Sequence, residues 1–268
     1  MNIDEEIVFL ASPTYDGRLD AGTAEAIYGY ATQKRQVAPK KNSGSLLSSN
    51  CNALLVAALN SRRVLKIKWF AMLHADVEPE PFWLDTLIDI AESRGADMLA
   101  ACVTLKDDRG LNSTGVGTSG SRRVEYRLTQ SQLHHDSFPK TFNASECMNA
   151  LRELPGNLRV SIDIPDPMLF LNTGCFIVRI DTDWMSAGKV WFSNDDWILK
   201  VNGEWRTRCF SEDWQFSQRV HDCGGLMLAT QEVKATHKGT AIFPSDKTWG
   251  IPNDCGHLTK ELETCQKS

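Results

Sequence analysis

The fold of this chain is decided at WFAMLHADVEPEPFWL, residues 69–84. The apolar run that precedes His74 has the length and composition of a buried strand, and two prolines separate it from a helical pattern that starts near Leu84. Between strand and helix stand His74, Asp76 and Glu78. A strand that ends in oxygen ligands beside a helix start is a good place to hold a divalent metal against phosphate.

The same alternation of strand and helix extends in both directions from this stretch. Apolar runs predict strands over residues 7–11, 64–73, 98–105, 168–180 (interrupted at 172–174), 226–229 and 233–237. Helical spacing predicts helices over residues 21–33, 45–60, 84–95 and 211–223. Residues 106–165 are polar, and we expect them to be rich in loops. Strands that alternate with helices indicate an α/β fold whose mostly parallel sheet is covered on both faces.

The length, charge and cysteine content of the chain argue against some classes of protein. The 268 residues fit one large domain, and the net charge of −5 argues against a protein that coats nucleic acid by charge alone, although a local basic groove stays open. The eight cysteines show no CxxC spacing, and no apolar run is long enough to span a bilayer. Because the amino end is acidic and leads directly into a strand pattern, we expect no signal peptide. We therefore expect reduced thiols and a cytoplasmic location.

Four short motifs follow one another along the chain. They are PTYDG at residues 13–17, HAD at 74–76, SEDW at 211–214 and THKG at 236–239. In this order they resemble a nucleotide-sugar glycosyltransferase of the GT-A fold, closest to glycosyltransferase family 2. The likeness covers roughly residues 5–240, and the short single-domain enzymes encoded by phages are the nearest type.

The resemblance implies an architecture. It predicts a Rossmann-like, mostly parallel central sheet flanked by helices, with a small antiparallel addition. Residues 1–240 would form the glycosyltransferase domain, with the nucleotide-binding half in 1–110 and the acceptor side in 111–240. Residues 241–268 would be an extension or lid.

The resemblance also implies a metal site for manganese or magnesium. In the family an Asp-x-Asp motif binds the ion that bridges the donor diphosphate, and Asp76 matches its second acid. His74 stands where the first acid is usual, so it would touch the metal, the ribose or a phosphate. His237 matches a late histidine that completes the site, and imidazole suits manganese better than magnesium. Glu78 is a reserve ligand; alternatively, these acids only solvate a strand-to-helix turn.

Two acids begin the helix predicted after Ser211. Glu212 and Asp213 lie in its first turn, where carboxylates also favour the helix dipole without any catalytic role. By resemblance, Asp213 is the base that removes a proton from the acceptor hydroxyl in an inverting transfer, and Glu212 orients the acceptor.

The donor pocket is predicted at the carboxyl end of the first strand, where open α/β sheets bind ligands. The backbone of Pro13 and Thr14 could read the nucleobase, Tyr15 could stack on it, and Asp16 completes the turn. An ordinary turn is the alternative.

Two further pairs of residues complete the expected donor and sugar contacts. Ser49 and Asn50 match a helix position that faces the nucleotide. Asn172 could bond sugar hydroxyls, and Gly174 permits close approach of the sugar.

These expectations combine into one function. The chain would be a metal-dependent inverting glycosyltransferase that moves a hexosyl or pentosyl group from a nucleoside-diphosphate sugar, most simply a UDP-sugar, to a hydroxyl. The phage likeness suggests hydroxymethylated pyrimidine in DNA as acceptor, in the host cytoplasm. Protein, lipid and polysaccharide acceptors stay open, as do a non-catalytic nucleotide- or sugar-binding domain and a nucleotidyltransferase. The nucleotidyltransferase would need a Gly-rich basic loop after the first strand, which residues 12–18 lack.

Several tryptophans stand apart from these motifs. Trp191, Trp197, Trp205 and Trp249 fall in polar, irregular sequence, where aromatic rings could stack on a sugar or on an extruded base.

Overall fold

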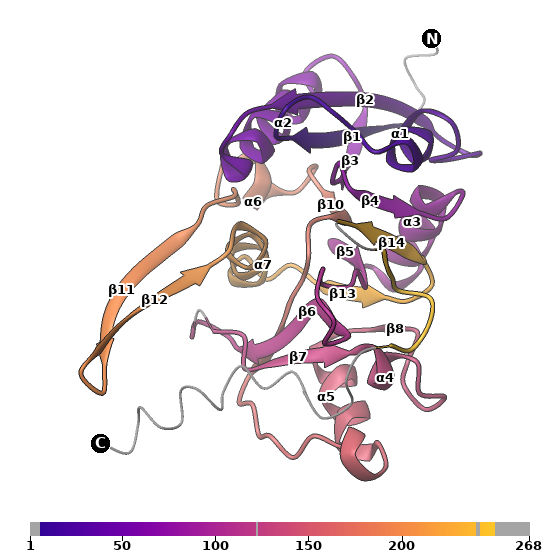
Figure 1. The fold of residues 1–268 in the computed structure, drawn as a ribbon. Coiled ribbons are helices and arrows are strands. Elements are labelled where there is room, and N and C mark those ends of the chain that lie inside the picture. Colours follow the sequence, from indigo (N-terminus) through magenta and orange to yellow (C-terminus); the bar gives the residue numbers. More distant parts are fainter. Residues whose placement is uncertain (1–5, 122, 240–241, 250–268) are drawn as a thin grey trace.

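A seven-stranded sheet forms the centre of the protein in a computed structural model, which describes residues 6–121, 123–239 and 242–249 (Figure 1). In spatial order its strands are β2 (Gln36–Ser43), β1 (Ile7–Thr14), β3 (Ile67–Leu73), β10 (Cys175–Arg179), β5 (Met98–Ala101), β13 (Met227–Thr230) and β8 (Thr141–Phe142).

The directions of the strands bring the carboxyl ends of several of them to one edge of this sheet. β1 is parallel to β2 and to β3, and β5 is parallel to β13. β10 lies antiparallel between β3 and β5, so β3 and β5 run the same way. β8 is antiparallel to β13. Five of the seven strands in the described sheet therefore share a direction, which confirms the predicted α/β class and mostly parallel sheet.

Both faces of the inner part of the sheet are buried, which explains why β1, β3, β5 and β10 read as continuous apolar runs. Successive side chains of β1 alternate between two cores. Phe9 packs in the core that holds Leu54 of helix α2 (Leu47–Ser61), and Leu10 packs in the core that holds Trp83 and Leu87 of helix α3 (Trp83–Arg94).

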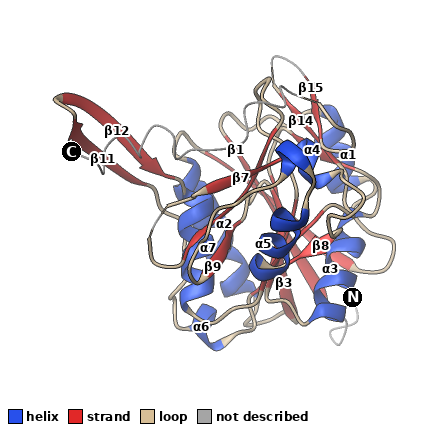
Figure 2. Cartoon of the chain, turned by 90° about the horizontal axis from the view of Figure 1, so that it is seen from below, coloured by secondary structure: helices blue, strands red, loops and turns tan. Residues whose placement is uncertain are grey.

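Three small antiparallel sheets are added to this body. They are β15 (Ile242–Pro244), β14 (Ala235–Lys238) and β4 (Val77–Pro79); β7 (Tyr126–Thr129), β6 (Leu111–Thr118) and β9 (Pro167–Phe170); and the hairpin of β11 (Asp195–Val201) and β12 (Glu204–Phe210). The hairpin projects from the body in both ribbon views (Figures 1 and 2). The predicted antiparallel addition is thus present and larger than expected.

The remaining helices are α1 (Ala21–Tyr28), α4 (Gln130–Leu133), α5 (Ala144–Glu153), α6 (Asp183–Ser186), α7 (Glu212–Asp222) and the short 3-10 helix η1 (Gly156–Leu158). Of these, α1 and α7 were predicted, with shifted ends, and the others were not. The expected helix over 21–33 ends earlier, before Gly29, because glycine is a poor helix former. The expected strands over 64–73 and 98–105 are likewise shorter.

Residues 106–165, predicted to be rich in loops, also contain β6, β7, β8, α4, α5 and η1, so the prediction was only partly right. Two capping boxes start helices there: Thr129 with Gln132 at α4, and Asn143 with Glu146 at α5. This sequence signature marks helix starts even in a polar segment. The strand β2 was also missed, because as an exposed edge strand it carries the polar sequence QVAPKKNS instead of an apolar run.

The segment expected as an extension after residue 240 begins as part of the body. β15 pairs with β14, and the backbone carbonyl of Phe243 accepts a 2.7 Å hydrogen bond from Thr104 Oγ1. Residues 250–268 lie outside the described residues. Across the described ranges, no helix combines the length and apolar character that crossing a bilayer requires. Cys51, Cys102, Cys147 and Cys175 are free and buried there.

Candidate functional site

Several of the predicted site residues lie at the edge where β1, β3 and β5 end. Because β10 runs antiparallel, its amino end reaches the same edge and brings residues 172–174 with it. The His74 backbone N–H donates to the carbonyl of Gly174 at 2.8 Å, and the Asp20 N–H donates to the carbonyl of Ala75 at 3.0 Å. The loops after β1, after β3 and before β10 are therefore in direct contact.

Asp76 and His237 face each other because β4 pairs with β14. The Lys238 N–H donates to the Asp76 carbonyl at 2.8 Å, and His237 Nε2 lies 3.7 Å from Asp76 Oδ1. His237 Nδ1 lies 2.7 Å from the carbonyl of Thr104, an acceptor, so Nδ1 carries the proton. Nε2 is therefore the ring nitrogen turned toward the Asp76 carboxylate, and it could be a ligand of a cation bound there.

Lys106 supplies a positive charge at this point. It follows β5, and its ammonium bonds Asp76 Oδ2. Burial works to raise the pKa of Asp76, but hydrogen bonds from His237 and Lys106 outweigh burial and hold that pKa well below its usual range. Asp76 is therefore a carboxylate at any physiological pH. The sequence reading missed Lys106, although a basic residue just past a strand end was the available signal.

Asp76 and His237 fit two of the ligands of a magnesium or manganese ion. Both metals accept few protein ligands and complete their coordination with water and substrate phosphates. Within residues 6–121, 123–239 and 242–249, no three His, Cys, Asp or Glu side chains are grouped as metal ligands, so His74 does not complete a protein triad there. The Lys106 ammonium contacts the same carboxylate that an ion would use.

His74 has a different environment. Its Nε2 is buried and has no hydrogen-bond partner among the described residues. Burial lowers the pKa of His74, against the opposing charges of Asp76 and Glu212, so its imidazole is neutral. An unsatisfied buried nitrogen of this kind is costly, and a bound ligand could satisfy it.

Asp213 lies in a polar pocket made by the turn before β10. Thr173 Oγ1 donates to Asp213 Oδ1, and Asn172 Nδ2 donates to Asp213 Oδ2 at 3.1 Å. Asn172 Oδ1 in turn accepts from the Gly174 N–H at 2.7 Å. A Cβ on Gly174 would lie 2.6 Å from that oxygen, so glycine is needed there. Asn172 and Gly174, predicted to contact sugar, thus orient the predicted base.

Burial sets the protonation of the two acids that begin α7. It raises the pKa of Asp213, and the hydrogen bonds from Thr173 and the charge of Arg127 only partly oppose that rise. Burial and the charge of Asp213 also raise the pKa of Glu212. Adjacent acids with raised pKa values are typical of sites for proton transfer.

Arg127 was not singled out from the sequence as a site residue. Its guanidinium lies 4.5 Å from the Trp214 ring centroid and donates to the carbonyl of Ser113 at 3.3 Å. Burial lowers the pKa of Arg127 to about 10, so the side chain stays charged at neutral pH. In β7 it alternates with the buried Tyr126 and Leu128, and this period of two was the available signal.

Two residues of the predicted nucleotide pocket, Asn50 and Thr14, hold neighbouring chain segments together. Asn50 is buried, and its Nδ2 donates to the carbonyls of Thr14 at 3.0 Å and Gly44 at 2.8 Å. Thr14 Oγ1 accepts from the Gly17 N–H at 3.0 Å. These two side chains tie β1 to β2 and to the start of α2. The backbone carbonyl of Thr14, predicted to read the nucleobase, accepts from Asn50 Nδ2 and from the Gly44 N–H.

The rest of the loop after β1 is open. Tyr15 is 77% exposed, so its ring can stack on a base. Asp16 Oδ1 accepts from the Arg18 N–H at 3.0 Å, which folds the loop, and Pro13 is buried in the strand. Ser49 is exposed on the first turn of α2.

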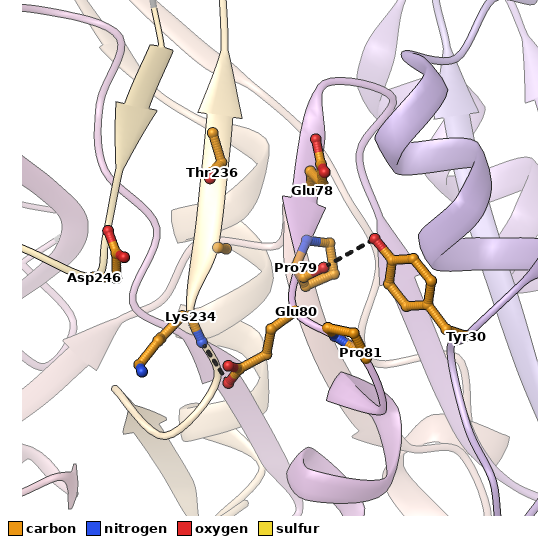
Figure 3. A pocket seen from close by; sticks show the side chains of 9 residues that line it. Tyr30, Glu78, Pro79, Glu80, Pro81, Lys234, Thr236 and Asp246 are labelled. Carbon is orange, nitrogen blue, oxygen red and sulfur yellow. Dashed lines mark hydrogen bonds between the residues drawn. The ribbon is translucent and has the colours of Figure 1, made fainter.

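Glu78, the reserve metal ligand, belongs to another surface. It pairs with Lys238, and it lines a pocket of about 190 Å³ with Tyr30 and Glu80. Figure 3 shows this pocket, where Glu80 accepts from the backbone N–H of Lys234 at 3.1 Å. Glu78 thus bonds Lys238, whereas Lys106 and His237 are the side chains at Asp76.

No protein-family model matches the chain. No curated protein matches it either. Among solved structures it is similar to A197 from STIV, with 13% sequence identity, a TM-score of 0.49, and coverage of 92% of this chain and 94% of that one. A likeness at this level carries no argument about activity.

Proposed function

We propose that this chain is a metal-dependent inverting glycosyltransferase that uses a nucleoside-diphosphate sugar and a hydroxyl acceptor. One observation supports this more than any other: two carboxylates at the same sheet edge have their pKa values pushed in opposite directions, down at Asp76 and up at Asp213. Carboxyl groups that differ in this way are suited to different roles in one reaction.

The Asp76 end would hold the donor. Asp76 and His237 would bind a divalent ion, which supplies Lewis-acid neutralisation of the departing diphosphate. Lys106 adds a positive charge beside the same phosphates. The exposed ring of Tyr15 would stack on the nucleobase, and His74 Nε2 would hydrogen-bond the donor.

The Asp213 end would activate the acceptor. The acceptor oxygen attacks the anomeric carbon while the bond to the diphosphate breaks, and the leaving diphosphate keeps the electron pair. Asp213 takes the acceptor proton, and its raised pKa makes it a stronger base than an ordinary aspartate. Asn172 and Thr173 hold the carboxylate in one orientation, and Glu212 would bind the acceptor beside it.

The ion pair between Lys106 and Asp76 supports a second candidate, a non-catalytic nucleotide-binding domain. In that case the ammonium would neutralise Asp76 permanently, and nucleotide binding would ignore divalent metal. The requirement for manganese separates the two candidates.

The experiment is a transfer assay read by mass spectrometry. The protein is incubated with Mn²⁺, a set of nucleoside-diphosphate sugars, and acceptors that include DNA containing hydroxymethylated pyrimidines. The proposal expects one hexosyl or pentosyl mass increment, which is absent with EDTA and absent in Asp213→Asn. The Asp163→Asn variant is the matched control, because Asp163 is 95% exposed and lies outside the site. Transfer that survives in a folded Asp213→Asn protein would overturn the residue roles.

A further inference from the structure

The hairpin of β11 and β12 has two open edges. Among the described residues its strands pair with each other and with no third strand, and the hairpin projects from the body (Figures 1 and 2). A two-stranded hairpin is only marginally stable by itself, and an open edge presents N–H and C=O groups that pair readily with another strand. Each edge of the hairpin is therefore a place where a further strand could be added.

The turn of the hairpin decides which backbone groups face these edges. Asn202 and Gly203 have positive φ angles of 51° and 85°, as in a two-residue type I′ turn. Such a turn is closed by a hydrogen bond between the residues that flank it, here Val201 and Glu204, which are directly opposite each other. The backbone groups of Val201 therefore face β12.

Hydrogen-bonded and non-hydrogen-bonded pairs alternate along antiparallel strands. Counting back from Val201, the backbone groups of Asp196, Ile198 and Lys200 face the open edge of β11. Thr207, directly opposite Ile198, faces the open edge of β12 in the same way.

The open edge of β11 is apolar at its centre. Ile198 is 76% exposed, and the side chains of Trp197 and Leu199 point to the other face of the hairpin. These three consecutive residues line a hollow of about 360 Å³ together with Ser121 and Arg208. An exposed apolar edge of this kind is a site for strand addition.

Two opposite charges flank this apolar centre, and neither faces its opposite across the hairpin. Asp196 is directly opposite Cys209, and Lys200 is directly opposite Trp205, with its ammonium 5.7 Å from the ring centroid. Residues 195–210 contain three acids and three cations, so two hairpins do not repel each other by net charge. The edge of β11 is thus suited to a strand that carries the same two charges in reverse order.

A second copy of β11, running antiparallel, has this order of charges. When Ile198 lies opposite Ile198 of the second copy, Asp196 lies opposite Lys200 at both ends of the pairing. Trp197 lies opposite Leu199 on the other face, at the hollow, and the outward backbone groups of the two strands meet. Shifting the register by two residues in either direction puts Ile198 opposite a charge and breaks both ion pairs.

The open edge of β12 offers no comparable pairing. Antiparallel pairing of two β12 strands about Thr207 puts Arg206 opposite Arg208 of the second copy, and like charges in that position are unfavourable. Pairing of β11 with β12 of a second copy leaves an edge open on each copy, so it leads to filaments and not to a closed assembly.

We infer that two copies of this chain associate through their β11 strands, paired antiparallel about Ile198, to form a four-stranded sheet. The interface is two-fold symmetric, because each copy uses the same strand. The two bodies lie at opposite ends of the shared sheet, separated by the length of a strand, about 24 Å. No residue of β11 belongs to the site around Asp76 and Asp213, so the association is independent of the proposed glycosyl transfer.

The test is sedimentation equilibrium of the full chain over a concentration series. The wild-type chain should show a reversible equilibrium that stops at two copies. Ile198→Pro should weaken the dimer by about tenfold or more, because each copy loses an N–H bond across the interface while the hairpin keeps its own bonds. Thr207→Pro is the matched control, since it removes the N–H at the directly opposite position on the other edge, and it should leave the dimer unchanged.

Charge reversal tests the register. Asp196→Lys and Lys200→Asp each put like charges opposite each other at both ends of the pairing, so each variant alone should dimerise about tenfold more weakly. An equal mixture of the two variants should form a mixed dimer of nearly wild-type affinity, because every charge then faces its opposite again. Native mass spectrometry identifies the mixed dimer by its mass, and thermal midpoints verify that each variant is folded.

Four results would overturn the inference. They are a wild-type chain that stays monomeric, a mass that rises beyond two copies, equal losses in the two proline variants, and a mixture of the charge variants that forms no mixed dimer. The first result also covers an edge that another segment of this chain or another protein occupies. Dimerisation without any metal-dependent UDP binding would remove the glycosyltransferase proposal and leave the dimer in place.

Discussion

The two ends of the candidate site hold the same kind of side chain in opposite surroundings. Asp76 accepts from an ammonium and faces an imidazole, so its carboxylate form is stabilised. Asp213 is held by a hydroxyl and an amide in a buried pocket, so its neutral form gains relative to its charged form. The difference shows that neighbouring chain segments decide whether an aspartate binds cations or accepts protons.

The largest expected effect is on catalysis at the Asp213 end. Asp213→Asn should lower kcat/KM for transfer by about 10²–10⁴, the contribution of a positioned general base. UDP binding in the presence of Mn²⁺ should be unchanged, because the substitution lies at the acceptor end. Steady-state kinetics and calorimetry measure the two quantities. An equal loss of UDP affinity in Asp213→Asn would contradict the proposal that Asp213 serves the acceptor and not the donor.

The pH dependence of transfer tests the same difference between Asp213 and Asp76. Asp213 acts when deprotonated, so the rate should fall as pH decreases through its raised pKa, and the acidic limb should lie above the ordinary value near pH 4. Asp76 would not titrate in that window, because its pKa is depressed. A pH profile of kcat/KM checks this, and a rate that stays flat down to about pH 4 would contradict it.

Stability should respond in the opposite direction to activity at Asp213. A raised folded-state pKa contributes stability that is present below the unfolded pKa and is lost as pH rises through the folded pKa. At pH 7 the charged Asp213 therefore costs stability, and Asp213→Asn should raise the thermal midpoint. The gain should disappear below about pH 4. Scanning calorimetry at the two pH values tests it, and a lower midpoint at pH 7 would show that the pocket does not penalise the charge.

A smaller effect is expected in the loop after β1. Tyr15→Ala should weaken UDP binding by about tenfold, within the range for removing one stacking ring. Tyr28→Ala is the matched control, since Tyr28 is also exposed, at 62%, but lies on α1. Equal affinity in the two variants would remove Tyr15 from the donor site.

The smallest predicted change concerns Lys106. Lys106→Met should lower the apparent Kd for Mn²⁺ by about fivefold, because an ion no longer competes with a partly exposed ion pair worth about 1 kcal/mol. Lys68→Met removes another partly exposed lysine ion pair, to Glu92, and serves as control. Weaker manganese binding in Lys106→Met would mean that the ammonium helps to hold the ion and does not compete with it.

The sequence predicted the features that depend on local pattern. The strand end at Leu73 was predicted correctly, and the first strand was predicted to end at Ala11, three residues before its end at Thr14. This was enough to expect site residues at the edge where parallel strands align their carboxyl ends. The sequence could not predict the groups that tune those residues. The bonds from Lys106 to Asp76 and from Thr173 to Asp213 join segments 30 and 40 residues apart, and only tertiary pairing creates them.

The predictions for the edge strand β2 and for residues 106–165 fell short for different reasons. β2 is polar because one side of it faces solvent, so neither alternation of apolar residues nor an apolar run indicated a strand there. Within residues 106–165, capping boxes mark the starts of α4 and α5, and the prediction did not use them. The predicted sugar contact of Asn172 stays a prediction; its bond to Asp213 is a tertiary contact that a single sequence does not reveal.

The central claim is that Asp76 serves the metal and donor while Asp213 serves the acceptor. The most direct measurement is calorimetric titration of UDP with and without Mn²⁺ into the wild-type protein, Asp76→Asn and Asp213→Asn. The account predicts manganese-dependent UDP binding in the wild type and in Asp213→Asn, and loss of the manganese dependence in Asp76→Asn. UDP binding that ignores manganese in the wild type, or that fails equally in both variants, would contradict it.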